Sequence, residues 1–249
     1  MNMGTSKKPN RRHLPKGLVI IHEDEALIVV DKPAGMLTMG TDTDKTRTVY
    51  FALTDYVRSG CARSNKRIFI VHRLDKETSG VLIFAKSEDV KFDLQRRWKE
   101  TRKRYIAVVH GKCNRLSDTI TSYLVENKAH LVYSTIDAKK GKLSRTSYKV
   151  LRETGDFSLL EVDPFTGRKH QIRVHMAENG HPIVGDKKYG KREEAYKWMA
   201  LHALAITIKH PVSGRQCTYK AEIPVHFSRL VGSLDRIDTC GMAKKDNPR

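Results

Sequence analysis

Short β-branched segments dominate this chain of 249 residues and constrain its fold more than any other feature. Blocks of alternating or continuous apolar residues predict many strands, against only a few segments with helical periodicity. Strands that outnumber helices and do not alternate with them favour an α+β domain with a large mixed or antiparallel sheet. The expected strands are Val19–His22, Leu27–Asp31, Phe69–Val71, Val81–Ala85, Tyr105–Val109, Ile120–Leu124, Thr146–Leu151, Ser158–Val162, Ala203–Ile208 and Cys217–Glu222.

Three segments have the spacing of helices. The first is expected over Thr46–Arg58. The second begins after Ser87, a residue type that caps helix N-termini. The third runs over His170–Glu178 and stops at Asn179-Gly180, a natural left-handed terminator. The apolar face of the second helix is formed by Val90, Leu94 and Trp98.

The chain is expected to hold one domain over residues 18–230, between a basic tail over 1–17 and a polar tail over 231–249. No internal repeat and no linker divides the middle. The basic start is not followed by an apolar stretch, so it is not a signal peptide. The longest apolar runs, such as Leu27–Val30, fall far short of the roughly 20 residues that a bilayer requires. The sequence therefore predicts no membrane partner.

Four cysteines are scattered without a CxxC pair, at Cys61, Cys113, Cys217 and Cys240. A disulfide framework or a zinc site needs closer or patterned spacing. Free thiols in a reducing compartment are the better interpretation, and they predict a cytoplasmic protein.

The charge of the chain is strongly positive. Its 47 Lys+Arg against 28 Asp+Glu give a formal net charge of +19. The basic residues are spread along the chain and form no long amphipathic helix, which favours RNA or DNA over a membrane surface as the partner. The plain alternative is that the lysines only keep the surface soluble.

The segment His72–Gly80 is the most informative for chemistry. A strand delivers a polar loop that holds Asp75 beside His72 and Arg73, and a buried strand then resumes. A carboxylate flanked by cations suits a nucleophile or an electrostatic stabiliser better than a general acid. The alternative is an aspartate that caps the turn through Thr78 and pairs with Arg73.

The segment Gly167–His175 brings Arg168, Lys169 and Arg173 to a helix start, where backbone amides also attract anions. Such a cluster can bind a phosphate or hold a catalytic carboxylate. His170 and His175 lie five residues apart rather than at i, i+4, so a metal site is not expected and an interior histidine is favoured.

Two other segments have an ordinary interpretation beside a functional one. Tyr105 leads a buried strand after a cationic run and can stack on a base or serve as a core aromatic. Asp186, between glycines, is expected to be architectural, and His202 is expected to be a packing residue.

Together these segments resemble the RluA-type RNA pseudouridine synthases, whose hallmark HRLDxxTSG stands here as His72–Gly80. The resemblance covers about residues 18–225, and its blocks follow the order of the family. The further blocks are Asp31–Gly35, Tyr105–Gly111, Ser144–Tyr148, Gly167–His175, Gly185–Gly190 and Leu201–Ala203.

The resemblance implies a role for particular residues. Asp75 matches the catalytic aspartate, and Arg173 matches the arginine that pairs with its carboxylate. Tyr105 matches the tyrosine that packs against the target base and is a candidate proton acceptor. Arg73 matches the arginine that can enter the RNA stack where the target leaves it. The remaining residues expected to bind RNA are His72, Arg168, Lys169 and His170.

The resemblance also implies the fold and the reaction. The expected fold is a bent, mixed and mainly antiparallel sheet with flanking helices and a central cleft, working without cofactor or metal. The sequence leaves the oligomeric state open, and a monomer is the default expectation. The partner is ribosomal RNA, transfer RNA or both. A stacked uridine is unreachable, so it has to be flipped out. The carboxylate can attack C1′, take a C2′ proton or add to C6 of the base, and the sequence does not choose among these.

Two departures from the family limit what the resemblance implies. Lys169 replaces the usual threonine and adds charge near the cleft. The S4 RNA-binding module of many members is expected to be absent.

Two other functions compete with an RNA-uridine isomerase. One is a non-catalytic RNA-binding or ribosome-assembly factor on the same fold, which needs none of Asp75, Tyr105 and Arg173. The other is a glycosidase or base-excision enzyme, which usually needs a second carboxylate for general acid work, and Glu77 is the carboxylate two residues from Asp75.

Overall fold

The computed structural model describes residues 14–42, 44–59, 61, 63–190 and 196–234. In chain order its elements are β1 (Val19–Glu23), β2 (Leu27–Lys32), α1 (Val49–Arg58), β3 (Phe69–Ile70), β4 (Ser79–Ala85), α2 (Glu88–Arg96), the 3₁₀ turn η2 (Trp98–Glu100), β5 (Arg102–His110), β6 (Ser117–Glu126), β7 (Val132–Thr135), β8 (Lys142–Glu153), β9 (Phe157–Pro164), α3 (Gln171–Glu178), β10 (Leu201–Lys209), β11 (Gln216–Lys220) and α4 (Val225–Val231).

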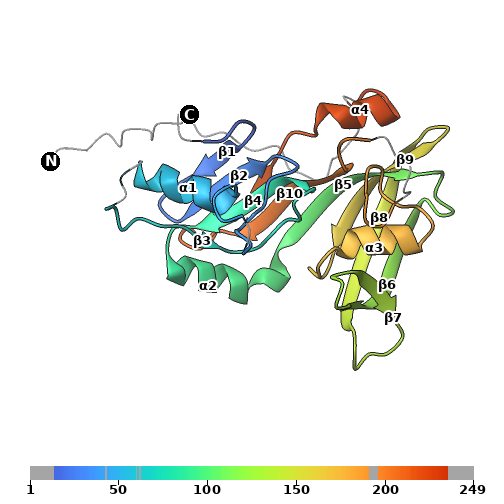
Figure 1. The fold of residues 1–249 in the computed structure, drawn as a ribbon, viewed down its shortest axis with the longest axis horizontal. Helices are drawn as coiled ribbons and strands as arrows, with labels where there is room; N and C mark the ends of the chain where they lie inside the picture. The colour runs from blue at the N-terminus through green and yellow to red at the C-terminus, as the bar shows by residue number, and fades with distance from the viewer. Residues whose placement is uncertain (1–13, 43, 60, 62, 191–195, 235–249) are drawn as a thin grey trace.

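Within these residues, the strands form one sheet whose main path is β1-β2-β4-β10-β5-β9-β8-β6-β7 (Figure 1). Strand β3 adds to β4, and β11 adds to β10. The pairing of β4 with β10 is parallel, and the other described pairs are antiparallel. The expected mixed and mainly antiparallel sheet is confirmed.

Strands β2 and β4 are covered on both faces. On one face Ile28 and Leu82 share a core with Leu53 of α1. On the other face Val29 shares a core with Leu94 of α2. A strand buried on both faces has no solvent-exposed side on which polar residues would alternate with apolar ones. This explains the continuous apolar runs in this part of the sequence.

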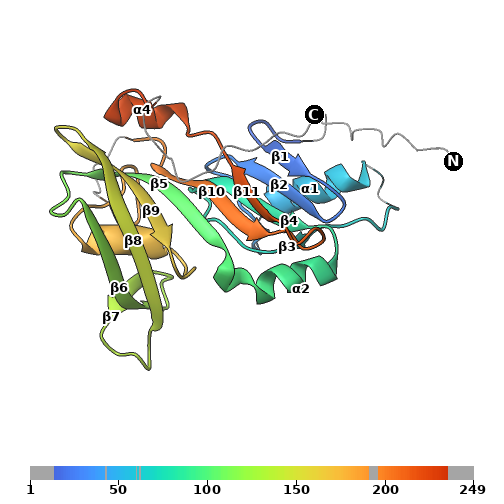
Figure 2. The same ribbon diagram turned by 180° about the vertical axis from the view of Figure 1, so that it is seen from behind.

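Strand β5 joins two halves of the sheet that run in different directions. In Figures 1 and 2, β5 leads from the half that holds β1, β2 and β4 to the half that holds β6, β7 and β8. Ile106 and Val108 of β5 pack in one core with Met176 of α3 and Phe227 of α4. The sheet is therefore bent, and each half carries its own helices.

The periodicity of the sequence located most elements within a few residues, but not all. Helix α1 begins at Val49 because the side chain of Thr48 caps it by accepting from the Phe51 amide. Helix α2 ends at Arg96, so Trp98 lies in η2 and not on the helix face that was predicted. The short elements β7 and α4 were not predicted.

Several other expectations concern the ends and the exterior of the chain. The predicted tails fall mostly on residues 1–13 and 235–249, which lie outside the described residues. No described helix has the length and the apolar character needed to cross a bilayer. Cys61, Cys113 and Cys217 are free thiols, as expected. Cys240 lies outside the described residues.

Candidate functional site

The loop between β3 and β4 carries Asp75, and buried polar contacts hold this loop in place. The fully buried Lys32 ammonium donates to three backbone oxygens, one of them the Lys76 oxygen at 3.1 Å. The Thr38 hydroxyl donates to the Leu74 carbonyl at 2.9 Å and accepts from the Leu74 amide. The backbone on both sides of Asp75 is therefore fixed. Neither Lys32 nor Thr38 was assigned a function from the sequence.

Arg173, in the first turn of α3, links Asp75 to a second carboxylate. Its Nη1 lies 3.2 Å from Asp75 Oδ2 and 3.6 Å from an oxygen of Glu77. Its Nε and Nη2 donate to the two oxygens of Asp186 at 2.7 and 2.8 Å. The side chains of Arg173 and Asp186 are 4% and 1% exposed, so the two hydrogen bonds between them form a buried ion pair. The structure brings Arg173 and Asp75 together, as the resemblance implied.

Asp186 is the residue of this site that the sequence assigned only to architecture. Its carboxylate also accepts from the amides of Lys188 and Tyr189. Burial raises the pKa of Asp186, but the hydrogen bonds from Arg173 and these amides bring it below its ordinary value. Burial lowers the pKa of Arg173, and Asp186 and Asp75 more than reverse this effect. Arg173 and Asp186 therefore both stay charged. No local signal separates such an aspartate from an ordinary turn residue.

His170 precedes α3 in a left-handed conformation, with φ of 52°. The Tyr189 hydroxyl accepts from the Val132 amide and lies within hydrogen-bond distance of His170 Nδ1, at 2.7 Å. The other ring nitrogen of His170, Nε2, lies 3.9 Å from Asp75 Oδ2. Burial lowers the pKa of His170, although the charge of Asp75 opposes it. Burial therefore favours the neutral His170 ring beside the carboxylate over a fixed cation.

Asp75 opens into a pocket of about 590 Å³ where the β3–β4 loop meets α3. Tyr105 of β5 lines this pocket. Burial, and then the charge of Asp75, raises the pKa of the Tyr105 phenol well above its ordinary value. A protonated phenol suits packing against a base and weakens the expectation that Tyr105 accepts a proton as a phenolate.

Three expected RNA-binding cations also line the pocket. Arg73 is exposed, and its one described contact is a weak one to Met39 Sδ at 3.8 Å. Arg168 is exposed and donates from Nε to a backbone carbonyl. Lys169 forms an ion pair with Glu126, which offsets part of its charge. Arg73 and Arg168 therefore present the more available charges.

Two histidines from the motifs are part of the framework. His72 lines the pocket, but its Nε2 accepts from the Ile83 amide at 3.1 Å, and burial holds its pKa at about 3. It is neutral and offers no charge to a phosphate. His175 is buried between the hydroxyls of Thr146 and Ser122, at 2.9 and 3.0 Å. This position agrees with the interior role favoured for it.

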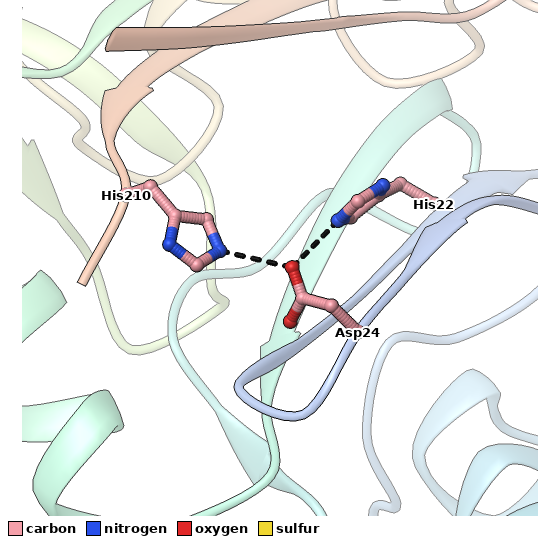
Figure 3. A group of neighbouring side chains, drawn as sticks. All are labelled: His22, Asp24 and His210. Carbon is pink, nitrogen blue, oxygen red and sulfur yellow. Dashed lines mark hydrogen bonds and ion pairs between the residues drawn. The ribbon is translucent and has the colours of Figure 1, made fainter. Parts of the chain in front are cut away.

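A separate cluster brings together donor atoms that a metal ion could share. Among the described residues, the ligand atoms of His22, Asp24 and His210 lie within 4.8 Å of one another (Figure 3). Nε2 of His22 and Nε2 of His210 lie 2.7 and 2.9 Å from the same oxygen of Asp24. The other oxygen accepts from the amides of Ala26 and Leu27.

The hydrogen bonds of His210 argue against a metal at this cluster. Its Nδ1 accepts from the amides of Val212 and Ser213, at 3.3 and 3.2 Å. A neutral His210 therefore carries its proton on Nε2 and donates it to Asp24. A metal on Nε2 requires that proton to move to Nδ1, where it would face two amide donors. The cluster instead ties the turn between β1 and β2 to the end of β10.

The chain is similar to known proteins over most of its length. A family model described as RNA pseudouridylate synthase matches residues 26–178. Ribosomal large subunit pseudouridine synthase C of Buchnera aphidicola is 34% identical over 229 residues, which cover 86% of this chain and 70% of that protein. Ribosomal large subunit pseudouridine synthase D of Borreliella burgdorferi is 38% identical over 189 residues, which cover 74% and 58%.

The fold is also similar to a solved structure. Human RNA pseudouridylate synthase domain containing 4 matches with a TM-score of 0.71 at 23% identity, over 84% of this chain and 90% of that one.

Proposed function

Because this chain belongs to the RluA-type RNA pseudouridylate synthases, we propose that it converts uridine to pseudouridine in ribosomal RNA with Asp75 as the catalytic carboxylate. One observation carries the proposal. The Asp75 carboxylate is fixed by its loop, contacts the buried Arg173 and opens into a pocket with room for a nucleotide.

The reaction balances without any outside group. The N1–C1′ bond breaks, a C5–C1′ bond forms, and the proton lost from C5 is matched by one gained at N1. Asp75 can attack C1′, take a C2′ proton or add to C6 of the uracil. In each case Arg173 holds the carboxylate in place and stabilises its charge.

Access to C1′ and C5 requires that the uridine leave its stack. Arg73 is exposed at the pocket and available to fill the gap left in the RNA. Tyr105 lies in the pocket wall, where its protonated ring can pack against the flipped base. The His170 ring lies beside the same carboxylate, with Nε2 at 3.9 Å from Asp75 Oδ2.

The RNA class follows from the relatives and from charge. The similar proteins of Buchnera aphidicola and Borreliella burgdorferi are named for the large ribosomal subunit. A net charge of +19 favours a long, structured polyanion. We therefore assign ribosomal RNA as the first substrate to test and transfer RNA as the second. We assign catalysis to residues 18–230 acting as a monomer, in the cytoplasm where such RNA is found.

The test is pseudouridine mapping on large-subunit ribosomal RNA and on transfer RNA after incubation with the purified protein. The test variant is Asp75→Asn, which changes the carboxylate in the pocket. The matched control is Asp137→Asn, which changes a carboxylate on a surface turn. New pseudouridine is expected with the wild type and with Asp137→Asn. Asp75→Asn is expected to form none while its RNA affinity stays within a few fold.

An active Asp75→Asn variant would remove Asp75 from the chemistry. Tight binding without conversion, on naked RNA and on ribosomal particles alike, would favour the RNA-binding or ribosome-assembly factor instead.

A further inference from the structure

The pocket extends past Asp75 to a second wall that the reaction does not use. Gln95, Trp98, Lys103 and His72 line this part, which is called the Trp98 wall here. It comes from the end of α2, from η2 and from the start of β5. A pocket of about 590 Å³ has more room than the flipped nucleoside alone requires.

Lys103 supplies the charge of the Trp98 wall. It precedes Tyr105 by two residues on β5, so both side chains face the pocket, roughly 7 Å apart along the strand. Lys103 is half-buried, and burial lowers the pKa of its ammonium. No carboxylate of the described residues forms an ion pair with it. A cation in this position gains from an anion that enters the pocket.

Trp98 supplies a flat apolar surface that is already held in place. Its ring packs against His72 with centroids 4.7 Å apart, and the Lys103 ammonium lies 5.7 Å from the ring centroid. The side-chain amide of Gln95 donates to the Val71 carbonyl at 3.2 Å and ties the end of α2 to the residue before His72. Aromatic rings of this kind bind nucleic-acid bases by stacking without regard to sequence.

We propose that the Trp98 wall binds the nucleotide next to the flipped uridine, with its phosphate on Lys103 and its base against Trp98. This inference rests on the proposed function, since it takes RNA as the substrate. Lys103 and Tyr105 are close enough to contact neighbouring nucleotides of one RNA strand. The target nucleotide would then lie at Asp75 and its neighbour at Trp98. His72 is neutral and supports the ring rather than the phosphate.

The experiment compares RNA binding and turnover in Trp98→Ala, Trp98→Phe and Lys103→Ala with the wild type. The probe is a transcript of large-subunit ribosomal RNA, and binding is measured over a series of salt concentrations. Trp98→Ala is expected to bind about tenfold more weakly at every salt concentration, as the loss of one stacked base predicts. Trp98→Phe keeps a ring and is expected to stay close to the wild type.

Lys103→Ala is expected to bind more weakly with a reduced salt slope, by about 0.7–0.9, as the loss of one phosphate contact predicts. For both alanine variants KM should rise, whereas kcat should stay within about twofold of the wild-type value, because the contacts of Asp75 are untouched. The chain offers a matched control in Lys197 and Trp198, another lysine–tryptophan pair, with 5.1 Å from ammonium to ring. Neither of these two residues lines the pocket, so Trp198→Ala and Lys197→Ala should change neither affinity nor slope.

Unchanged affinity in both wall variants overturns the proposal, as does a fall in kcat with KM unchanged. If Trp98→Ala does not fold, the affinity and the salt slope of Lys103→Ala still decide the proposal. The binding measurements need no turnover, so they judge the Trp98 wall even if no pseudouridine is formed. Failure of the proposed function is recorded separately, by the mapping experiment.

Discussion

The N–H groups of a single arginine are divided between two carboxylates at this site. Two bonds from Arg173 go to Asp186, in a buried pair that fixes both the position of the guanidinium and its plane. Only then does Nη1 face Asp75 at a defined distance. Without Asp186, Arg173 would remain a buried charge free to move toward Asp75 or Glu77. Asp186 therefore acts through Arg173 as a positioning residue.

Asp186→Asn is expected to lower kcat about 10²-fold, because small displacements of catalytic groups cost that much. RNA affinity should change little, since Asp186 is 1% exposed. Single-turnover rates and binding constants measure the two effects, and urea unfolding corrects for lost stability. In an Arg173→Ala background the same change should have little further effect on the rate. A full additional loss there would show that Asp186 does not act through Arg173.

At the scale of elements, the catalytic loop depends on how closely β4 approaches β10. Gly80 pairs with Ala203 in the parallel register immediately after the loop that carries Asp75. Its φ of +112° suits glycine, and a Cβ there would lie 2.3 Å from the Ala203 carbonyl oxygen. The close pairing of β4 with β10 therefore requires glycine at this position.

Gly80→Ala is expected to destabilise the protein by at least about 1–3 kcal/mol from backbone strain, with the steric clash in addition. Urea unfolding of the variant measures this loss. Gly155→Ala is the matched control, because a Cβ at Gly155 meets nothing within 4 Å. Equal stabilities of the two variants would contradict the close approach of β4 and β10.

At the scale of the whole molecule, buried neutral histidines lie in both halves. His175 of α3 is 1% exposed, and burial lowers its pKa to about 4. His202 of β10 is fully buried against Ser79, and burial, then His226, lowers its pKa to about 3. Below pH 6.5 the unfolded chain binds protons at these positions that the folded chain does not. Stability is therefore lost as the pH falls from about 6.5 toward 4.

His175→Gln isolates one of these histidines. At pH 8 the difference in unfolding free energy between variant and wild type reports only the lost contacts with Thr146 and Ser122. At pH 5 the wild type carries an extra penalty that the variant lacks, so the difference should shrink by about 2 kcal/mol. Urea unfolding at both pH values measures it. A difference that does not depend on pH would mean that His175 takes up protons equally in both states.

The sequence by itself determined the features that depend on local order. Residue periodicity located the buried strands β2 and β4, because a strand covered on both faces must be apolar throughout. The motif around Asp75 and the segment around Arg173 were recognised from residues that lie next to one another in the chain. Elements with weak local signals were not found, among them β7 and the short helix α4, which starts after Pro224 without a side-chain cap.

Only the tertiary structure decided which further residues support the pair of Asp75 and Arg173. Asp186 is thirteen residues from Arg173, and nothing in its neighbours separates a turn residue from the partner of a buried guanidinium. His72 was expected to bind RNA, a role that stays a prediction, but its ring nitrogen accepts from a strand amide. Trp98 was assigned to a helix face and instead lines the pocket. Burial and hydrogen bonds that form only in the folded chain set these roles.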